Sequence, residues 1–278
     1  MTSALPVRPV DRPLVMGVVN VTPDSFSDGG RYLAADDAIA RGHQLIADGA
    51  DLLDIGGEST RPGAGRPSDD EELRRVVPVV RALAGTGVPI SIDTMRARVA
   101  QAALDAGAHI VNDVSGGLAD PDLVRVVAEA QAPMIAMHWR GHSADMQQRA
   151  QYDDVVEDVL RELGQRRDEL LEAGVLPDRL VLDPGLGFAK TGPQNWRLLR
   201  SIARFHDLGQ PVLVGASRKR FLERVGARGV DPVPAQDRDL ATAAVSVLLA
   251  QAGVWGVRVH DARSTLAAVE VVAAVASS

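Results

Sequence analysis

Short apolar runs alternate with stretches of helical periodicity along almost the whole chain. The runs are continuous and rich in Val, Ile and Leu, which is typical of parallel strands buried on both faces. We expect strands at residues 14–19, 52–55, 89–92, 109–111, 133–137, 180–182, 211–214 and 254–259. Between them, apolar residues at helical spacing predict helices, among them 36–47, 69–83, 241–249 and 266–275. Repeated strand–helix order predicts a closed (β/α)8 TIM barrel, with a doubly wound open sheet as the alternative.

The chain of 278 residues is long enough for one barrel, and no segment is rich enough in Pro, Gly or Ser to divide it. We therefore expect a single TIM-barrel domain over residues 14–278. Residues 1–13 contain three prolines and no apolar core of a signal peptide, so we interpret them as a flexible leader.

Composition excludes several classes of function. The formal net charge of −7 gives no overall basic field for nucleic acid, and no apolar run approaches the ~20 residues of a membrane span. The absence of cysteine excludes disulfides and thiolate metal sites and favours a cytoplasmic location. Of the 30 basic residues only two are lysines, Lys190 and Lys219, which hints at tasks that need a compact ammonium group.

Polar residues end most of the predicted strands. Asp93, Asn112 and Asp183 directly follow aliphatic runs, so they would stand at the edge of a dry core and need partners. In a TIM barrel all these strand ends meet at one face, where loops build the site. Carboxylates and an amide could bind the amino and ring N–H donors of a flat heterocycle. As an alternative, Asp93 and Asp183 could cap the helices that follow them.

Basic groups cluster after the last two strands. Lys219, Arg258 and His260 lie where such barrels often hold a phosphate group. Asn20, at the end of the first strand, offers a neutral oxygen that could hold Mg²⁺ against a pyrophosphate. The remaining histidines, including His138, are interpreted as ordinary hydrogen-bonded residues. Glu58 could be catalytic or could act as an N-cap or order its loop, and Lys190 could order its Gly-rich loop.

Seven segments, in order along the chain, resemble the dihydropteroate synthase family. They are 17–30 (GVVNVTPDSFSDGG), 54–63 (DIGGESTRPG), 91–94 (SIDT), 111–116 (VNDVSG), 183–190 (DPGLGFAK), 215–219 (GASRK) and 258–261 (RVHD). The resemblance implies a pterin-binding barrel that condenses 6-hydroxymethyl-7,8-dihydropterin pyrophosphate with p-aminobenzoate, giving 7,8-dihydropteroate and pyrophosphate for folate biosynthesis.

The resemblance also implies roles for individual residues. The pterin would be held by Asp93, Asn112, Met137, Asp183 and Lys219. The pyrophosphate would be held by Asn20 with Mg²⁺, Arg258 and His260. The p-aminobenzoate pocket would consist of Thr60, Arg61, Pro62, Phe188, Ser217 and Lys219. Asp28 and Lys219 would take part in catalysis. The resemblance further implies a homodimer and inhibition by sulfonamides, which mimic p-aminobenzoate.

Other functions fit parts of the pattern. A pterin-binding paralogue without turnover would keep the same pocket. A barrel aldolase could use Lys219 in a Schiff base, but Asp93, Asn112 and Asp183 would then have no clear task. A corrinoid-dependent pterin methyltransferase would share the pterin pocket but would not need the 22–26 loop or a pyrophosphate site.

Overall fold

The computed structural model describes residues 4–9, 11–21, 30–58, 66–142, 146–229 and 231–278. Eight parallel strands form one sheet in the order β6-β5-β4-β3-β2-β1-β8-β7. A parallel bridge between Leu182 and Val212 joins β6 to β7 and brings the sheet round to near closure. The strands are β1 (Leu14–Asn20), β2 (Leu52–Gly56), β3 (Ile90–Asp93), β4 (Ile110–Asp113), β5 (Met134–Met137), β6 (Leu180–Asp183), β7 (Leu213–Gly215) and β8 (Gly256–Val259). The predicted (β/α)8 barrel is confirmed.

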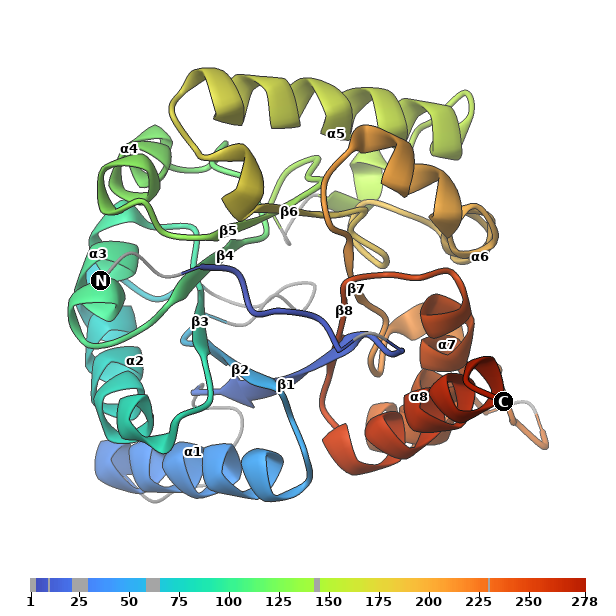
Figure 1. The fold of residues 1–278 in the computed structure, drawn as a ribbon, viewed down its shortest axis with the longest axis horizontal. Helices are drawn as coiled ribbons and strands as arrows, with labels where there is room; N and C mark the ends of the chain where they lie inside the picture. Colours follow the sequence, from blue (N-terminus) through green and yellow to red (C-terminus); the bar gives the residue numbers. More distant parts are fainter. Residues whose placement is uncertain (1–3, 10, 22–29, 59–65, 143–145, 230) are drawn as a thin grey trace.

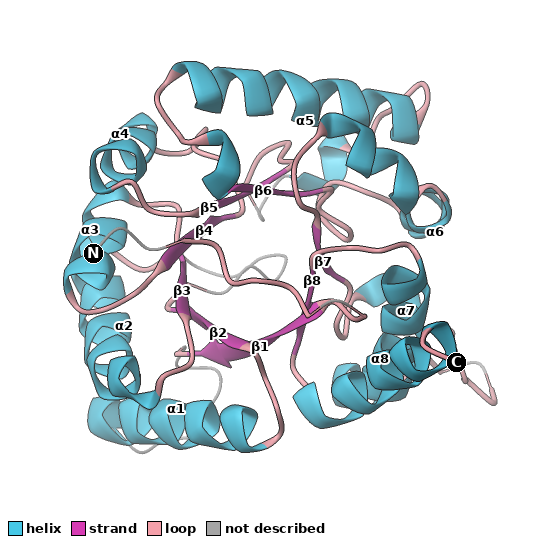
Figure 2. Cartoon of the chain, viewed as in Figure 1, coloured by secondary structure: helices cyan, strands magenta, loops and turns pink. Residues whose placement is uncertain are grey.

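Helices surround the strands on the outside, as Figures 1 and 2 show. They are α1 (Gly30–Ala47), α2 (Asp69–Leu83), α3 (Ala97–Asp105), α4 (Pro121–Ala130), α5 (Val155–Glu172), α6 (Gly192–Arg200), α7 (Asp239–Gln251) and α8 (Ala262–Ala276). Helix α8 begins four residues before the predicted 266 because Asp261 caps it, accepting a hydrogen bond from the backbone N–H of Ser264.

The interior of the barrel is built in two layers. Buried apolar side chains form the lower layer: Leu14, Met16, Leu52, Ile110, Ile135, Val181, Leu213 and Trp255. Because strand side chains alternate with a period of two, the residue two positions further along each strand faces the same interior, nearer the carboxyl end. These positions carry Asp54, Asn112, Met137, Asp183 and Gly215, and Arg258, two residues beyond Gly256 at the start of β8, joins them. The polar layer therefore rests directly on a dry apolar floor.

The N-terminal segment, for which we predicted a flexible leader, makes contacts in its described part. Leu5 packs against the apolar floor, and the indole N–H of Trp255 donates to the carbonyl of Pro6. Arg12 forms an ion pair with Asp51 at 2.6 Å. Figure 1 shows this segment crossing one end of the barrel. It covers the end at which the strands begin, opposite the polar layer.

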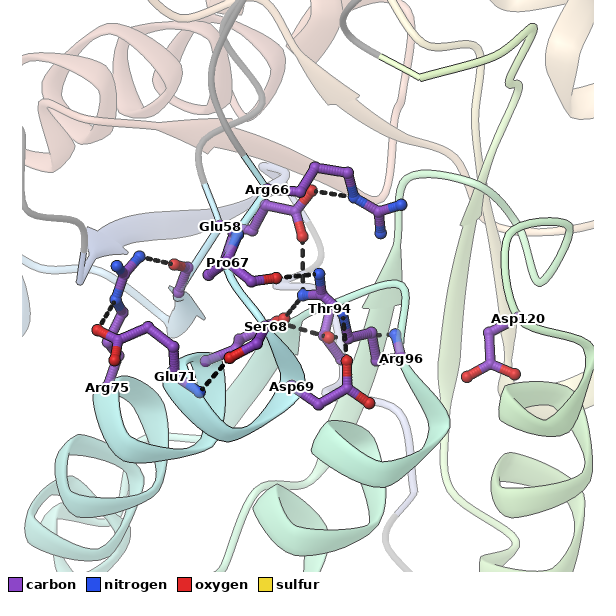
Figure 3. Close-up of polar contacts among 12 residues, drawn as sticks. Glu58, Arg66, Pro67, Ser68, Asp69, Glu71, Arg75, Thr94, Arg96 and Asp120 are labelled. Atoms are coloured by element: carbon purple, nitrogen blue, oxygen red, sulfur yellow. Dashed lines mark hydrogen bonds and ion pairs between the residues drawn. The ribbon is translucent and has the colours of Figure 1, made fainter.

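A polar network joins the start of α2 to the turn after β3 (Figure 3). Arg96 forms ion pairs with Glu58, Glu72 and Asp69 and donates to the carbonyl of Pro67. Thr94 donates to Glu72, which is almost fully buried, and burial raises the pKa of Glu72 against the opposing effect of Thr94 and Arg96.

Glu58 lies at the end of this network nearest the barrel. One carboxylate oxygen accepts from Arg96 at 2.8 Å and the other from Arg66 at 2.9 Å. Residues on both sides of segment 59–65 are thus bound to the same guanidinium group, through the side chain of Glu58 before it and the carbonyl of Pro67 after it. These contacts match the loop-ordering interpretation of Glu58.

We expect Arg96→Met to lower the free energy of unfolding by about 3–5 kcal/mol, because it leaves the buried Glu72 carboxylate without its cation. Arg98→Met is the matched control. Arg98 is on the same helix, but its ion pair with Asp70 is exposed, so its loss should cost less than about 1 kcal/mol. Urea denaturation followed by circular dichroism compares the two. Equal stability of both variants would contradict the importance of this network.

Candidate active site

Buried polar side chains meet at the carboxyl ends of the strands. Asp93 ends β3, Asn112 lies in β4 and Asp183 ends β6, and each side chain is at least nine-tenths buried. Arg258 lies in β8 and is half-buried. The predicted heterocycle-binding residues and one predicted phosphate-binding cation therefore share one rim.

Arg258 is the centre of this cluster. Its Nε donates to Asp54 at 2.5 Å, and one terminal N–H group donates to Asp93 at 2.7 Å. Asn112 donates its amide to the same Asp54 oxygen at 3.1 Å. Burial opposes the charge on Arg258, but the two carboxylates outweigh this effect and raise its pKa. The acids predicted to bind a heterocycle and the cation predicted to bind a phosphate therefore pair directly.

Asp54 is a site residue that our sequence reasoning missed. It was quoted within the 54–63 motif, yet no role was assigned to it. The available signal was an acid inside an apolar strand, two residues beyond Leu52 and so facing the barrel interior. Its side chain is fully buried, and Oδ1 has no hydrogen-bond partner in the described structure.

The two rim aspartates are shifted toward the protonated form. Burial raises the pKa of Asp93 to about 7; Arg258 opposes this shift and Asp54 adds to it. Burial also raises the pKa of Asp183, against the opposing charge of Lys219. Near neutral pH, Asp93 can therefore either donate or accept a hydrogen bond. Neither aspartate caps a helix, because the N-caps of α3 and α6 are Arg96 and Thr191.

The loop between β6 and α6 lies beside Lys219. The ammonium group of Lys219 donates to the carbonyl of Leu186 and lies 4.7 Å from the centre of the Phe188 ring. Burial lowers the pKa of Lys219 to about 8, against the opposing charge of Asp183. The structure thus brings together Lys219, Phe188 and Asp183, as the resemblance implied.

Ser217 and His260 are in direct contact. The Ser217 hydroxyl accepts from the backbone N–H of His260 at 3.1 Å and hydrogen bonds to ring atom Nδ1 at 2.9 Å. Arg41, on α1, donates to the carbonyl of His260 at 2.5 Å. Ser217 therefore orients the ring of His260, and Arg41 holds its backbone.

Asn20 and Met137 lie on the same rim. Asn20 ends β1 and is exposed, and its register partner Gly56 is in turn paired with Asp93. Met137 ends β5 in a buried position in register with Asp183. Within the described ranges, no group of three or more His, Cys, Asp or Glu side chains is placed to hold a metal ion. Asn20 brings one amide oxygen to an exposed edge, which fits an ion that takes few protein ligands.

Four predicted residues, namely Asp28, Thr60, Arg61 and Pro62, lie outside the described residues. The other predicted site residues all lie at the carboxyl ends of the strands or in the loops that follow them. None of the described helices is both long and apolar enough to span a bilayer.

Known proteins with similar sequences and structures extend this picture. Residues 16–260 match the pterin binding enzyme family. Dihydropteroate synthase from Mycobacterium leprae is 53% identical over 262 residues, which cover 94% of this chain and 92% of that protein. Dihydropteroate synthase from Xanthomonas albilineans, solved with 4-aminobenzoic acid, has a TM-score of 0.88 and 44% identity, covering 96% of this chain and 94% of that one. The Yersinia pestis dihydropteroate synthase, solved as a sulfonamide drug complex, has a TM-score of 0.91 and 39% identity, covering 100% of this chain and 99% of that one.

The resemblance found in the motifs is therefore confirmed over nearly the full chain. The carboxylate, amide and cationic residues of the site described above all lie within residues 16–260. On this match, and on identity above 50% to a full-length relative, the chain belongs to the pterin-binding enzyme family.

Proposed function

We propose that this chain is a dihydropteroate synthase, a transferase of folate biosynthesis that joins a dihydropterin pyrophosphate to p-aminobenzoate and releases pyrophosphate. The match to dihydropteroate synthases along nearly the whole chain supports this activity. The observation that carries the site assignment is the buried cluster in which Arg258 pairs with Asp54 and Asp93.

The polar layer suits a pterin. The aminopyrimidine edge of a pterin carries amino and ring N–H donors, and carboxylates offer paired acceptors to such an edge. Asp93, Asn112 and Asp183 are held by short strands on an apolar floor, so their positions are set before a ligand arrives. Met137 adds an apolar surface beside Asp183 for the ring face.

The rim cations suit the pyrophosphate. Arg258 and His260 stand beside the carboxylates at the end of β8, where they can stabilise negative charge on the leaving group. Asn20 would supply the protein ligand to Mg²⁺. When bound, Mg²⁺ would supply additional positive charge to the pyrophosphate oxygens.

The reaction exchanges one bond at the pterin methylene carbon. The C–O bond to pyrophosphate breaks and its electron pair leaves with the pyrophosphate. The amine nitrogen of p-aminobenzoate forms the new C–N bond and then releases a proton. Lys219 lies near the Asp183 carboxylate and next to the Phe188 ring. It can therefore contact both the pterin and the p-aminobenzoate. We place Thr60, Arg61, Pro62 and Ser217 around the p-aminobenzoate and Asp28 near the reacting carbon on the family resemblance.

We also propose that two copies associate through α7 and α8. These helices pack against each other, and large apolar side chains on them are exposed. The exposed residues are Leu240, Leu248, Val271 and Val275. They repeat at helical spacing, and exposed apolar stripes of this kind mark association surfaces. A cytoplasmic location stays a prediction, consistent with the absence of cysteine.

The activity is tested by measuring pyrophosphate release and dihydropteroate formation with the pterin pyrophosphate, Mg²⁺ and p-aminobenzoate. Lys219→Met should reduce kcat/KM by about 100-fold or more, because it removes a buried cation that contacts both substrates. Arg220→Met is the control, since Arg220 is the next residue but its side chain is mostly exposed. A saturating sulfonamide should block turnover by the unmodified protein. Folded protein that releases no pyrophosphate under any of these conditions would be a binding paralogue.

The metal assignment is tested by titrating Mg²⁺ after chelation. We expect Asn20→Ala to raise the Mg²⁺ concentration for half-maximal activity by about 10-fold, since one of few protein ligands is lost. Asn20→Asp keeps an oxygen at the same position and should retain activity at low Mg²⁺. If the titration curve of Asn20→Ala matches that of the unmodified protein, Asn20 is not a ligand of Mg²⁺.

The association surface is tested by the mass of the protein in solution. Replacing both Leu248 and Val271 with Glu should convert a dimer to a monomer, because the new carboxylates would have to be buried in the interface. Leu118→Glu, at a similarly exposed apolar residue away from these helices, is the control and should leave the mass unchanged. Light scattering coupled to size exclusion distinguishes the species. A double variant that stays dimeric would place the interface elsewhere.

A further inference from the structure

The loop between β6 and α6 has an unfavourable backbone conformation. Gly185, Gly187 and Ala189 all have positive φ, at 70°, 83° and 48°. Positive φ costs a residue with a side chain free energy that surrounding contacts must offset, so Ala189 needs external support. The glycines have no space for a side chain: a Cβ on Gly185 would lie 2.7 Å from the carbonyl oxygen of His138. A packed loop with this backbone requires specific groups to hold it.

Lys190 holds this loop together with Asn195, whose side chain accepts from the backbone N–H of Gly187 at 2.6 Å. The side chain of Lys190 is almost fully buried, and the ammonium group donates to the carbonyls of Gly185 at 3.1 Å and Phe188 at 3.0 Å. The third contact is to ring atom Nδ1 of His138 at 3.0 Å. Three N–H donors thus meet three acceptors in different directions. A flat guanidinium group presents its donors in one plane and cannot reproduce this arrangement.

The contact to His138 continues to the outside of the barrel. Ring atom Nε2 of His138 is 3.0 Å from Glu162 on α5. Since Nδ1 accepts from Lys190, Nε2 carries the proton and donates to Glu162, which fixes the tautomer. Arg140 donates to both oxygens of Glu162, at 2.9 Å from Nε and 2.5 Å from a terminal nitrogen. Glu162, His138 and Lys190 form one chain of hydrogen bonds, which we call the loop strut.

Burial disfavours the charged form of Lys190, and the nearby acids offset only part of this effect. Burial lowers the pKa of Lys190 to about 7, with Asp183 opposing the shift and Lys219 and Arg140 adding to it. Burial also lowers the pKa of His138 to about 4, so the ring is neutral at physiological pH and can accept from the ammonium group. The Arg140 and His138 contacts keep the pKa of Glu162 well below its usual range despite its partial burial.

The loop that the strut holds supplies both partners of Lys219. The Leu186 carbonyl accepts from its ammonium group, and the Phe188 ring lies beneath it. Gly187 packs against the stem of Lys219, where an added Cβ would lie 2.8 Å from Cδ. A displacement of this loop would therefore move the surroundings of Lys219. Asp183 is linked to the same loop, since Oδ1 accepts from the backbone N–H of Gly185 at 2.7 Å, but strand β6 fixes the Asp183 backbone.

We propose that the loop strut of Lys190, His138 and Glu162 is a positioning device that sets the p-aminobenzoate side of the active site through Phe188 and Lys219. This inference rests on the proposed function for its kinetic consequence. It also accounts for a lysine at position 190 in a chain whose other cations, apart from Lys219, are arginines.

The kinetic test compares KM for the two substrates in Lys190→Met and Lys190→Arg. Both variants should raise KM for p-aminobenzoate by about 10-fold, because Phe188 and Lys219 both face it. KM for the pterin pyrophosphate should rise by less than about 3-fold, because Asp93 and Asn112 lie on other strands and still hold the pterin when Lys219 shifts. Equal rises in both KM values would indicate general disruption and overturn the proposal, as would unchanged values for Lys190→Met. Full rescue by Lys190→Arg would show that charge alone suffices and would overturn the three-acceptor geometry.

A second variant avoids the risk that Lys190→Met does not fold. Glu162→Ala removes the outer end of the strut at a partly exposed position on α5 and should raise KM for p-aminobenzoate by about 3-fold. Glu157→Ala is the control, because Glu157 is on the same helix but pairs with Arg204 on the surface. If Glu162→Ala behaves like Glu157→Ala, the outer part of the strut has no positioning role.

A measurement without substrate separates this inference from the proposed function. Amide hydrogen exchange over residues 184–189 should be about 10-fold faster in Lys190→Met and faster to a lesser degree in Glu162→Ala, with no change in Glu157→Ala. Unchanged exchange in Lys190→Met would overturn the strut even if the protein is an active synthase. If exchange is faster in Lys190→Met but the unmodified protein shows no turnover, the proposal of the loop strut holds and the proposed synthase activity does not.

Discussion

The pairing of Arg258 with Asp54 and Asp93 is the interaction on which the site depends. Two carboxylates stand on an apolar floor inside the barrel, where an unpaired charge would be strongly disfavoured. One guanidinium group satisfies both and so allows them to stay at the rim. Since breaking a buried pair costs more than the pair itself contributes, each member constrains the positions of the others. The cluster is rigid, polar and accessible from one end.

This arrangement gives the rim two neighbouring kinds of recognition. In the proposed function, carboxylates and an amide would face a ring with N–H donors, while cations on β8 and on the loop after β7 would face an anion. A pterin pyrophosphate would bring both a donor edge and negative charge. It could therefore replace parts of the internal pairing with contacts of the same kind, which would keep the cost of opening the cluster low. Without substrate, the internal ion pairs hold the site in shape.

Support for the rim comes from behind the strands as well as from within the barrel. Arg96 joins Glu58 to α2 and α3 below the second loop, and the loop strut reaches the sixth loop from α5. Both devices use a buried ionic group that contacts several backbone or carboxylate oxygens. The β6–α6 loop, with positive φ at Ala189, is held in this way by the rigid frame, which leaves the residues that face the proposed substrates free for binding.

The sequence by itself determined the barrel, because buried parallel strands produce continuous apolar runs and their polar ends repeat in a fixed order. It also determined the family and placed Asp93, Asn112, Asp183, Lys219 and Arg258 on one rim, since strand ends converge in this fold. Only the tertiary structure decided which of these groups pair. The contacts of Asp54 with Arg258, separated by 204 residues, and of Lys190 with His138, separated by 52, depend on side-chain direction and on packing between distant strands. The local sequence pattern does not predict such contacts, because hydrogen bonds inside a barrel depend on which strands lie next to each other.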